Sequence, residues 1–149
     1  MNNVNIDDVD FDDVDINKLS QQGLINYLSE TVKENSLDRT INIISRIQDL
    51  DRPDRYGYTI LNAACMSGRI DVVRYLVENC RIDINKKGIE DSTSIICAAI
   101  NEHYEIVKYL VEHGADPNIR DPVNKTAYDF LNENQERRIR SIANQHGFA

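Results

Sequence analysis

The chain is organised around one stretch, Glu105-Ile-Val-Lys-Tyr-Leu-Val-Glu-His-Gly-Ala-Asp-Pro-Asn118. Thirty-four positions earlier it reads almost the same, as Asp71-Val-Val-Arg-Tyr-Leu-Val-Glu-Asn-Cys80. Self-similarity at a period of 33–34 residues is typical of solenoids, in which short helical units stack because no unit can bury its apolar side alone. This period predicts the architecture of the chain.

Each copy of this stretch is expected to form an amphipathic helix. The apolar residues fall at helical spacing and therefore share one face: they are Val72, Val73, Leu76 and Val77 in the first copy and Ile106, Val107, Leu110 and Val111 in the second. Gly114 follows the second copy where a helix end favours a left-handed residue.

Weaker copies flank these helices. Residues 54–68 read as a turn followed by a short helix, with Gly57 supplying positive φ and Thr59 capping the helix. Thr93 is expected to cap the equivalent helix in the next copy, and Asn124 to make the turn of the third. A helix is also expected after Ser20, and a last one at about 135–145.

These motifs resemble the ankyrin repeat family, whose pattern of turn, capping threonine, paired alanines, apolar helix and Gly-Ala-Asp-x-Asn is recognisable over 54–131. The resemblance implies an all-α solenoid of about four stacked helix-turn-helix repeats with degenerate terminal caps. The domain would span residues 19–149, with repeats at about 19–52, 53–86, 87–119 and 120–149 after an acidic tail at 1–18.

The chain departs from the family pattern at two places in each repeat. The usual helix-starting proline is replaced by Ile60, Ser94 and Ala127. The histidine that usually ties neighbouring loops together is replaced by Asn62, Ile96 and Asp129, and an isoleucine cannot make that hydrogen bond. Because caps and ties contribute about 0.5–2 kcal/mol each, we expect modest stability.

Composition indicates a soluble, cytoplasmic protein. The chain has 25 acidic and 17 basic residues, a net charge of −8, and six of its aspartates lie within residues 1–16. This acidity disfavours nucleic acid as a partner and favours a basic protein. No signal peptide or membrane-spanning stretch is expected, and three cysteines without a C-x-x-C pair fit a reduced compartment.

The acidic tail allows two interpretations: a mobile, solvated segment, or a docking segment that presents Val9, Phe11, Val14 and Ile16 to a basic partner. Asp8, Asp10 and Asp12 have the opening spacing of a calcium loop. Asp13 and Leu19 stand where that loop needs its glycine and its bidentate glutamate, which disfavours calcium.

No residues are expected to be catalytic, to hold a cofactor or to bind a metal. His103 and His113 fall at structural positions of the repeat, and neither they nor His146 stand beside a nucleophile. Cys65 and Cys97 read as core residues, while Cys80, at a helix end, is the thiol with the best prospect of reactivity.

We therefore predict a non-enzymatic, monomeric module that binds a partner protein through its concave face, as an inhibitor, competitor or immunity factor. The alternative is a structural subunit that forms homo-oligomers through exposed repeat ends, which polar end helices would oppose. The resemblance maps the partner contacts to the turn tips and first-helix ends, namely Arg55, Tyr56, Tyr58, Met66, Ser67, Ile89, Glu90, Ser92, Ile100, Asn101, Pro122, Val123, Lys125, Glu133 and Asn134.

Overall fold

The computed structural model describes residues 13–149, and over that range the chain is helical without strands. Its helices pair in chain order: α1 (Gln21–Thr31) with α2 (Leu37–Ile44), α3 (Ile60–Met66) with α4 (Ile70–Asn79), α5 (Ser94–Ile100) with α6 (Tyr104–Glu112), and the 3₁₀ turn η5 (Ala127–Phe130) with α7 (Glu133–Gln145). Two further 3₁₀ turns are η3 (Ile16–Lys18) and η4 (Ile89–Asp91).

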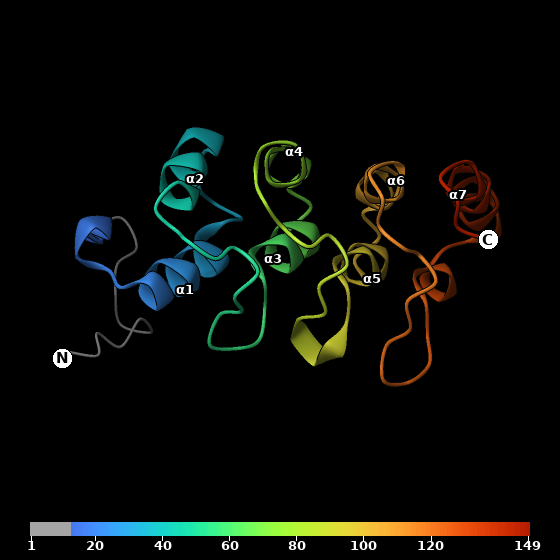
Figure 1. Cartoon of the computed structure of the whole chain (residues 1–149), viewed down its shortest axis with the longest axis horizontal. Helices are drawn as coiled ribbons and strands as arrows, with labels where there is room; N and C mark the ends of the chain where they lie inside the picture. The colour runs from blue at the N-terminus through green and yellow to red at the C-terminus, as the bar shows by residue number, and fades with distance from the viewer. Residues whose placement is uncertain (1–12) are drawn as a thin grey trace.

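The helix pairs stack side by side into two rows (Figure 1). An inner row holds α1, α3, α5 and η5, and an outer row holds α2, α4, α6 and α7. Three loops, at residues 52–58, 86–92 and 120–126, project from the side of the inner row that faces away from the outer helices. This arrangement confirms the predicted all-α solenoid.

One continuous apolar core runs between the two rows. The twin helices α4 and α6 contribute the predicted residues, with Val73, Leu76 and Leu110 fully buried. Val77 differs from the prediction because it is only half-buried at the edge of this core. Burial of these side chains against neighbouring pairs is the main stabilisation of a helix too short to persist alone.

The predicted helix caps are present, with one exception. Ser20 accepts from the Gly23 amide, and Thr59 forms a reciprocal capping box with Asn62. The prediction for Thr93 was wrong: its side chain makes no cap hydrogen bond, and its buried hydroxyl has no hydrogen-bond partner among residues 13–149. The last helix begins at Glu133 rather than near 135, because Asn132 caps it by accepting from the Gln135 amide.

The projecting loops have the predicted left-handed residues at their turns. Gly57 has φ +93° and Asn124 has φ +67°. In the middle loop two consecutive non-glycine residues are left-handed, Glu90 at φ +49° and Asp91 at φ +54°. Such backbone costs free energy for residues with a Cβ atom, so surrounding structure must hold it in place.

Side-chain hydrogen bonds fix each repeat on the one before it. Arg69 donates to the carbonyls of Val32 and Asn35 at 2.6 and 2.7 Å. At the equivalent place one repeat later, the His103 Nε2 lies 3.1 Å from the Met66 carbonyl. The contacts of His103 are therefore structural, as the sequence predicted.

The described end of the acidic tail lies on the first repeat. Val14 and Ile16 are half-buried against the core, and Arg46 donates to the Asn17 side chain at 2.6 Å. The calcium interpretation of Asp8, Asp10 and Asp12, and the docking roles of Val9 and Phe11, lie outside the described residues.

Candidate protein-binding surface

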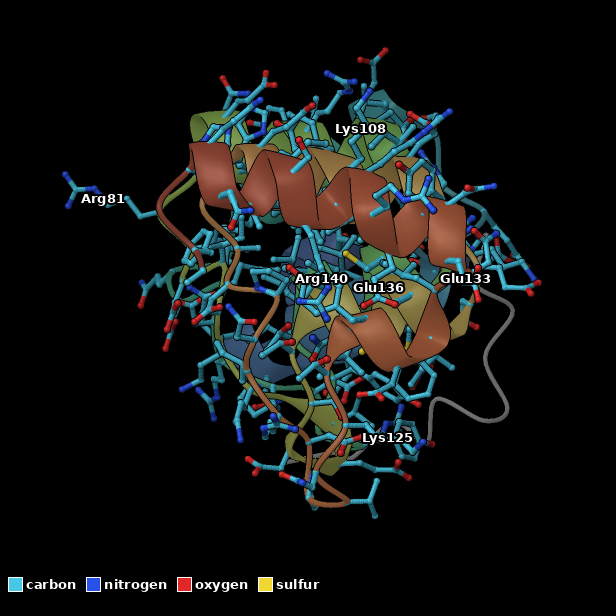
Figure 2. The ribbon with its side chains drawn as sticks, turned by 90° about the vertical axis from the view of Figure 1, so that its right-hand side faces the viewer. Arg81, Lys108, Lys125, Glu133, Glu136 and Arg140 are labelled. Atoms are coloured by element: carbon cyan, nitrogen blue, oxygen red, sulfur yellow. The ribbon has the colours of Figure 1, made fainter. Side chains whose placement is uncertain are left out.

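The three projecting loops carry nine of the predicted contact residues, and these side chains differ in their exposure to solvent. Exposed side chains are Arg55, Tyr56, Glu90, Pro122, Val123 and Lys125, while Tyr58 and Ile89 are half-buried. Ser92 is buried, so the structure contradicts its prediction as a surface contact. Its hydroxyl lies 3.5 Å from the Glu90 carbonyl, which places it inside the strained loop. Figure 2 shows Lys125 on the last loop, far from Lys108 on the outer row.

Three of the predicted contact residues are large hydrophobic side chains that the structure leaves exposed. Within residues 13–149 the exposed large hydrophobic side chains are Tyr56, Ile100 and Val123, at 54%, 51% and 71% exposure. Met66 and Ile89 instead pack partly against the core. Two of the three exposed groups stand on projecting loops, and Ile100 ends the inner helix α5.

The first loop is held by polar contacts at its base and tip. The Arg55 guanidinium pairs with Glu30 at 2.9 Å and lies 5.4 Å from the centroid of the Tyr56 ring. Asp54 accepts from the backbone amides of Tyr56 and Tyr58 through one carboxylate oxygen. This loop therefore presents Tyr56 from a fixed backbone, which lowers the entropy lost on binding.

The contact residues at the helix ends are less uniform. Asn101, Glu133 and Asn134 are exposed, whereas Ser67 is half-buried. Asn101 turns back to donate to the Cys97 carbonyl at 2.8 Å. The structure thus brings the last two of these pairs, at 100–101 and 133–134, to the surface more fully than the pair at 66–67.

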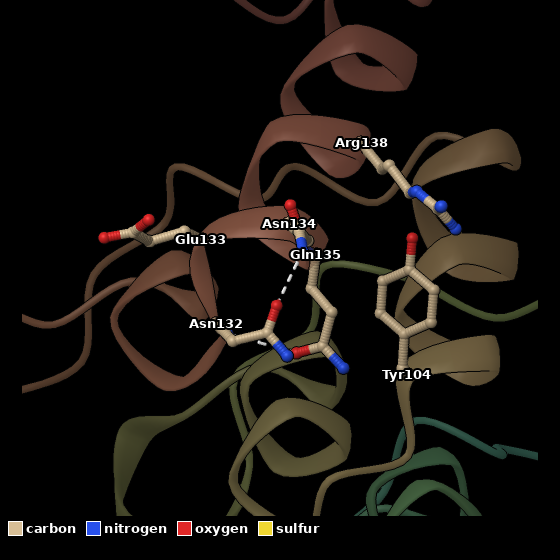
Figure 3. Close-up of a pocket in the computed structure, with 6 residues that line it drawn as sticks. All are labelled: Tyr104, Asn132, Glu133, Asn134, Gln135 and Arg138. Atoms are coloured by element: carbon tan, nitrogen blue, oxygen red, sulfur yellow. Dashed lines mark hydrogen bonds between the residues drawn. The ribbon is translucent and has the colours of Figure 1, made fainter.

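A hollow of about 470 Å³ lies between the beginnings of α6 and α7, and its lining residues are Tyr104, Asn132, Glu133, Asn134, Gln135 and Arg138. Figure 3 shows the Arg138 guanidinium beside the Tyr104 ring, and Glu133 directed away from both. A smaller hollow of about 140 Å³ adjoins it through Tyr104, Asn132 and Gln135. We call the smaller one the inner hollow; its other lining residues are Ala99, Glu102, Phe130 and Leu131.

Sequence reasoning missed most of these lining residues and named only Glu133 and Asn134. A signal was present in the repeat register. Glu102 occupies the position held by Gly68 in the preceding repeat, and Tyr104 occupies that of Ile70. A charged residue in place of glycine, next to a surface aromatic, marks a place where the repeat departs from its structural pattern.

The cysteines and His113 have structural surroundings. Burial raises the pKa of all three thiols, that of Cys97 to about 11, and the rise at half-buried Cys80 disfavours the thiolate needed for reactivity. His113 stacks on Tyr109 with ring centroids 4.0 Å apart, and its Nδ1 lies 2.7 Å from the Tyr109 carbonyl.

The described residues, 13–149, lack two further kinds of feature. They contain no group of three or more His, Cys, Asp or Glu side chains placed to hold a metal ion. No helix among them has the length and apolar character needed to cross a bilayer.

Comparison with known proteins agrees with this geometry. The sequence pattern of the family described as ankyrin repeats in three copies matches residues 22–121, which is most of the described stack. The chain belongs to the ankyrin repeat family. Repeats of this family are generally protein–protein interaction modules without catalytic activity of their own.

Curated relatives extend the similarity beyond the matched repeats. The chain is 33% identical to alpha-latrocrustotoxin-Lt1a of Latrodectus tredecimguttatus over 128 residues, which cover 86% of the chain and 9% of the toxin. It is 37% identical to protein fem-1 homolog CG6966 of Drosophila melanogaster over 78 residues, covering 47% and 12%. It is 30% identical to the E3 ubiquitin-protein ligase hecd-1 of Caenorhabditis elegans over 118 residues, covering 78% and 4%.

The chain therefore spans about one eighth or less of the length of each of these ankyrin relatives. The similarity carries the fold and the general mode of action of the repeats.

Proposed function

We propose that this ankyrin repeat chain is a non-enzymatic module that binds a partner protein through the surface formed by the projecting loops and the ends of the inner helices. The module acts by covering a surface of its partner, as an inhibitor, competitor or immunity factor does. A body of stacked helices suits this role because it presents its loops without having to fold on binding.

The observation that carries the proposal is the placement of Tyr56, Ile100 and Val123. Each is more than half exposed, and all three belong to the loops and inner row. Exposed large apolar groups cost free energy in water, and aromatic and aliphatic anchors dominate the energetics of protein interfaces. The outer helices α2, α4 and α6 contribute none of the exposed large hydrophobic groups found in residues 13–149.

The charge of the chain supports a basic partner. Net charge is −8 over the full sequence, and the middle loop exposes Glu90, while its neighbour Asp91 pairs with Lys87 at 3.2 Å. Complementary charge at the edge of an interface speeds association and selects among partners.

The alternative, assembly into homo-oligomers through the ends of the stack, finds less support. The outermost described helix, α7, exposes the charged groups Glu133, Arg137, Arg138 and Arg140 (Figure 2 shows Glu133 and Arg140). Arg140 also lies 3.9 Å from the centroid of the Tyr128 ring and covers it. A polar face of this kind closes a solenoid, so we expect a monomer in light scattering at all concentrations tested.

A triple variant tests the proposed surface. The partner is isolated with the wild-type chain from its native source, identified and purified, and its affinity is measured by calorimetry. Changing Tyr56, Ile100 and Val123 together to Ser is expected to weaken binding about 30-fold or more. The matched control changes three exposed outer-row residues, Asn42, Asn79 and Glu112, to Ser. Equal affinity of both variants would refute the proposed surface.

A further inference from the structure

We propose that the inner hollow binds a lysine or arginine side chain of the partner. The inference rests on the proposed function and names the chemistry that one part of the binding surface recognises. It follows from the shape of the hollow, its single carboxylate and the backbone at that carboxylate.

Four of the seven residues that line the inner hollow are apolar or aromatic. Ala99, Tyr104, Phe130 and Leu131 line it, and the last three are half-buried residues that pack against the core. A volume of about 140 Å³ accommodates one long side chain but not a helix or a strand. The aliphatic stem of a lysine or arginine packs favourably on apolar side chains, and the rings of Tyr and Phe attract its cationic end.

The lining of the inner hollow carries a negative charge. Glu102 is the one ionisable acid or base other than tyrosine that lines the inner hollow, and Asn132 and Gln135 supply neutral amides. Glu102 is exposed, and its backbone amide donates to the Ala99 carbonyl at 3.1 Å, but its carboxylate takes part in none of the hydrogen bonds or ion pairs found in residues 13–149. Its carboxylate is therefore available to a cation from outside the chain.

The backbone at Glu102 shows that the fold does not require this side chain. Glu102 has φ +61°, and Gly68, at the same place in the preceding repeat, has φ +70°. Glycine adopts this conformation without steric cost, whereas a residue with a Cβ atom does not. A carboxylate at a left-handed position beside a hollow fits a binding role better than a structural one.

Two basic residues near the inner hollow limit what it accepts. Arg138 lines the larger hollow next to it, and the Lys125 ammonium lies 5.9 Å from the centroid of the Phe130 ring. Arg138 could instead attract an acidic side chain into the larger hollow. The charge of the probe therefore decides between the two hollows.

The test uses capped pentapeptides Gly-Ser-Xaa-Ser-Gly, with Lys, Arg, Glu or Leu in the middle, titrated into the isotope-labelled full chain and followed by NMR. The Lys and Arg peptides are expected to shift the amide signals of Ala99, Glu102, Tyr104 and Leu131 along a saturating curve. The Leu and Glu peptides are expected to leave them in place. Preference for the Glu peptide, or no saturable shift with the basic peptides up to on the order of 10 mM, would overturn the inference.

Two variants assign the effect to Glu102. Glu102→Gln keeps the shape and removes the charge, so the basic peptides should bind about tenfold more weakly. Glu112→Gln, an exposed change on the outer row, should have no effect. Lys125→Met removes a like charge beside Phe130 and should strengthen binding of the same peptides. Unchanged affinity in Glu102→Gln, or weaker binding in Lys125→Met, would contradict the assignment.

The two proposals fail separately. A chain that binds its partner through Tyr56, Ile100 and Val123 but ignores the basic peptides retains the proposed function and loses this inference. A chain that binds the peptides through Glu102 but shows no dependence on the three apolar residues loses the proposed surface instead.

Discussion

The Asn62 side chain donates from Nδ2 to the Ser94 hydroxyl at 2.8 Å, and both residues are buried between consecutive repeats. The same carboxamide accepts from the Thr59 amide at 3.0 Å. Asn62 thus caps its own helix and ties it to the next one, at the position where the family usually has histidine. Ile96, its counterpart one repeat later, is buried without such a tie.

Asn62→Ala is expected to lower the free energy of unfolding by about 2–4 kcal/mol, because it leaves the Thr59 amide and the Ser94 hydroxyl without their partners. Urea unfolding followed by circular dichroism measures this change. Combining it with Ser94→Ala in a double-mutant cycle should give a coupling of about 1 kcal/mol. Strictly additive effects would show that the contact contributes nothing between the repeats.

Arg69→Ala is expected to destabilise the chain by about 2 kcal/mol, because two carbonyls of the first repeat lose a charged donor. Arg81→Ala is the matched control, since Arg81 extends from an exposed loop (Figure 2). Equal unfolding midpoints for the two variants would contradict the role assigned to Arg69.

Stability should depend on alkaline pH through Tyr109. Burial and the 2.7 Å hydrogen bond to Glu78 raise the pKa of Tyr109 to about 12, above its ordinary value of about 10. The unfolded chain therefore loses this proton first, so the contribution of the hydroxyl is complete below pH 10 and is lost as pH rises through 12.

Tyr109→Phe isolates that contribution. At neutral pH the variant should be less stable than wild type by about 1 kcal/mol. This difference in stability should disappear as the pH rises to the raised pKa of Tyr109. Tyr75→Phe, on the neighbouring outer helix, controls for the loss of a hydroxyl. A stability difference independent of pH would contradict the account.

Gly68→Ala is expected to lower the free energy of unfolding by more than the backbone strain at this position, because the new side chain would also collide with a neighbour. An added Cβ would lie 2.7 Å from the His103 ring, at φ +70°. Gly147 has φ +87°, and a Cβ added there would have no atom within 4 Å. Gly147→Ala therefore carries only the conformational cost of about 1 kcal/mol. Thermal unfolding should give the larger decrease for Gly68→Ala, and equal decreases would argue against the contact with His103.

The repeat period predicted the fold because packing of a solenoid depends on apolar spacing. Leu76 and Leu110 occupy equivalent places in the two copies of the repeated stretch and are both fully buried. The residues that make the turns could also be predicted from the sequence, since Gly57 and Asn124 have the expected left-handed backbone. These features depend on a residue and its near neighbours in the chain.

The surface was harder to predict because exposure depends on contacts between repeats. Met66 and Ile89 stand at partner-contact positions of the family, yet here they pack against the core. The inner hollow combines Glu102 and Phe130, which belong to different repeats and come together only when the repeats stack. Thr93 has the sequence of a cap, but its side chain makes no cap hydrogen bond.

Hydrogen–deuterium exchange of the chain with and without its purified partner tests the central claim most directly. The account predicts slower exchange on binding at residues 54–58, 99–102 and 121–125, with α2, α4 and α6 unchanged. Protection confined to those outer helices, with free exchange at Tyr56, Ile100 and Val123, would contradict it.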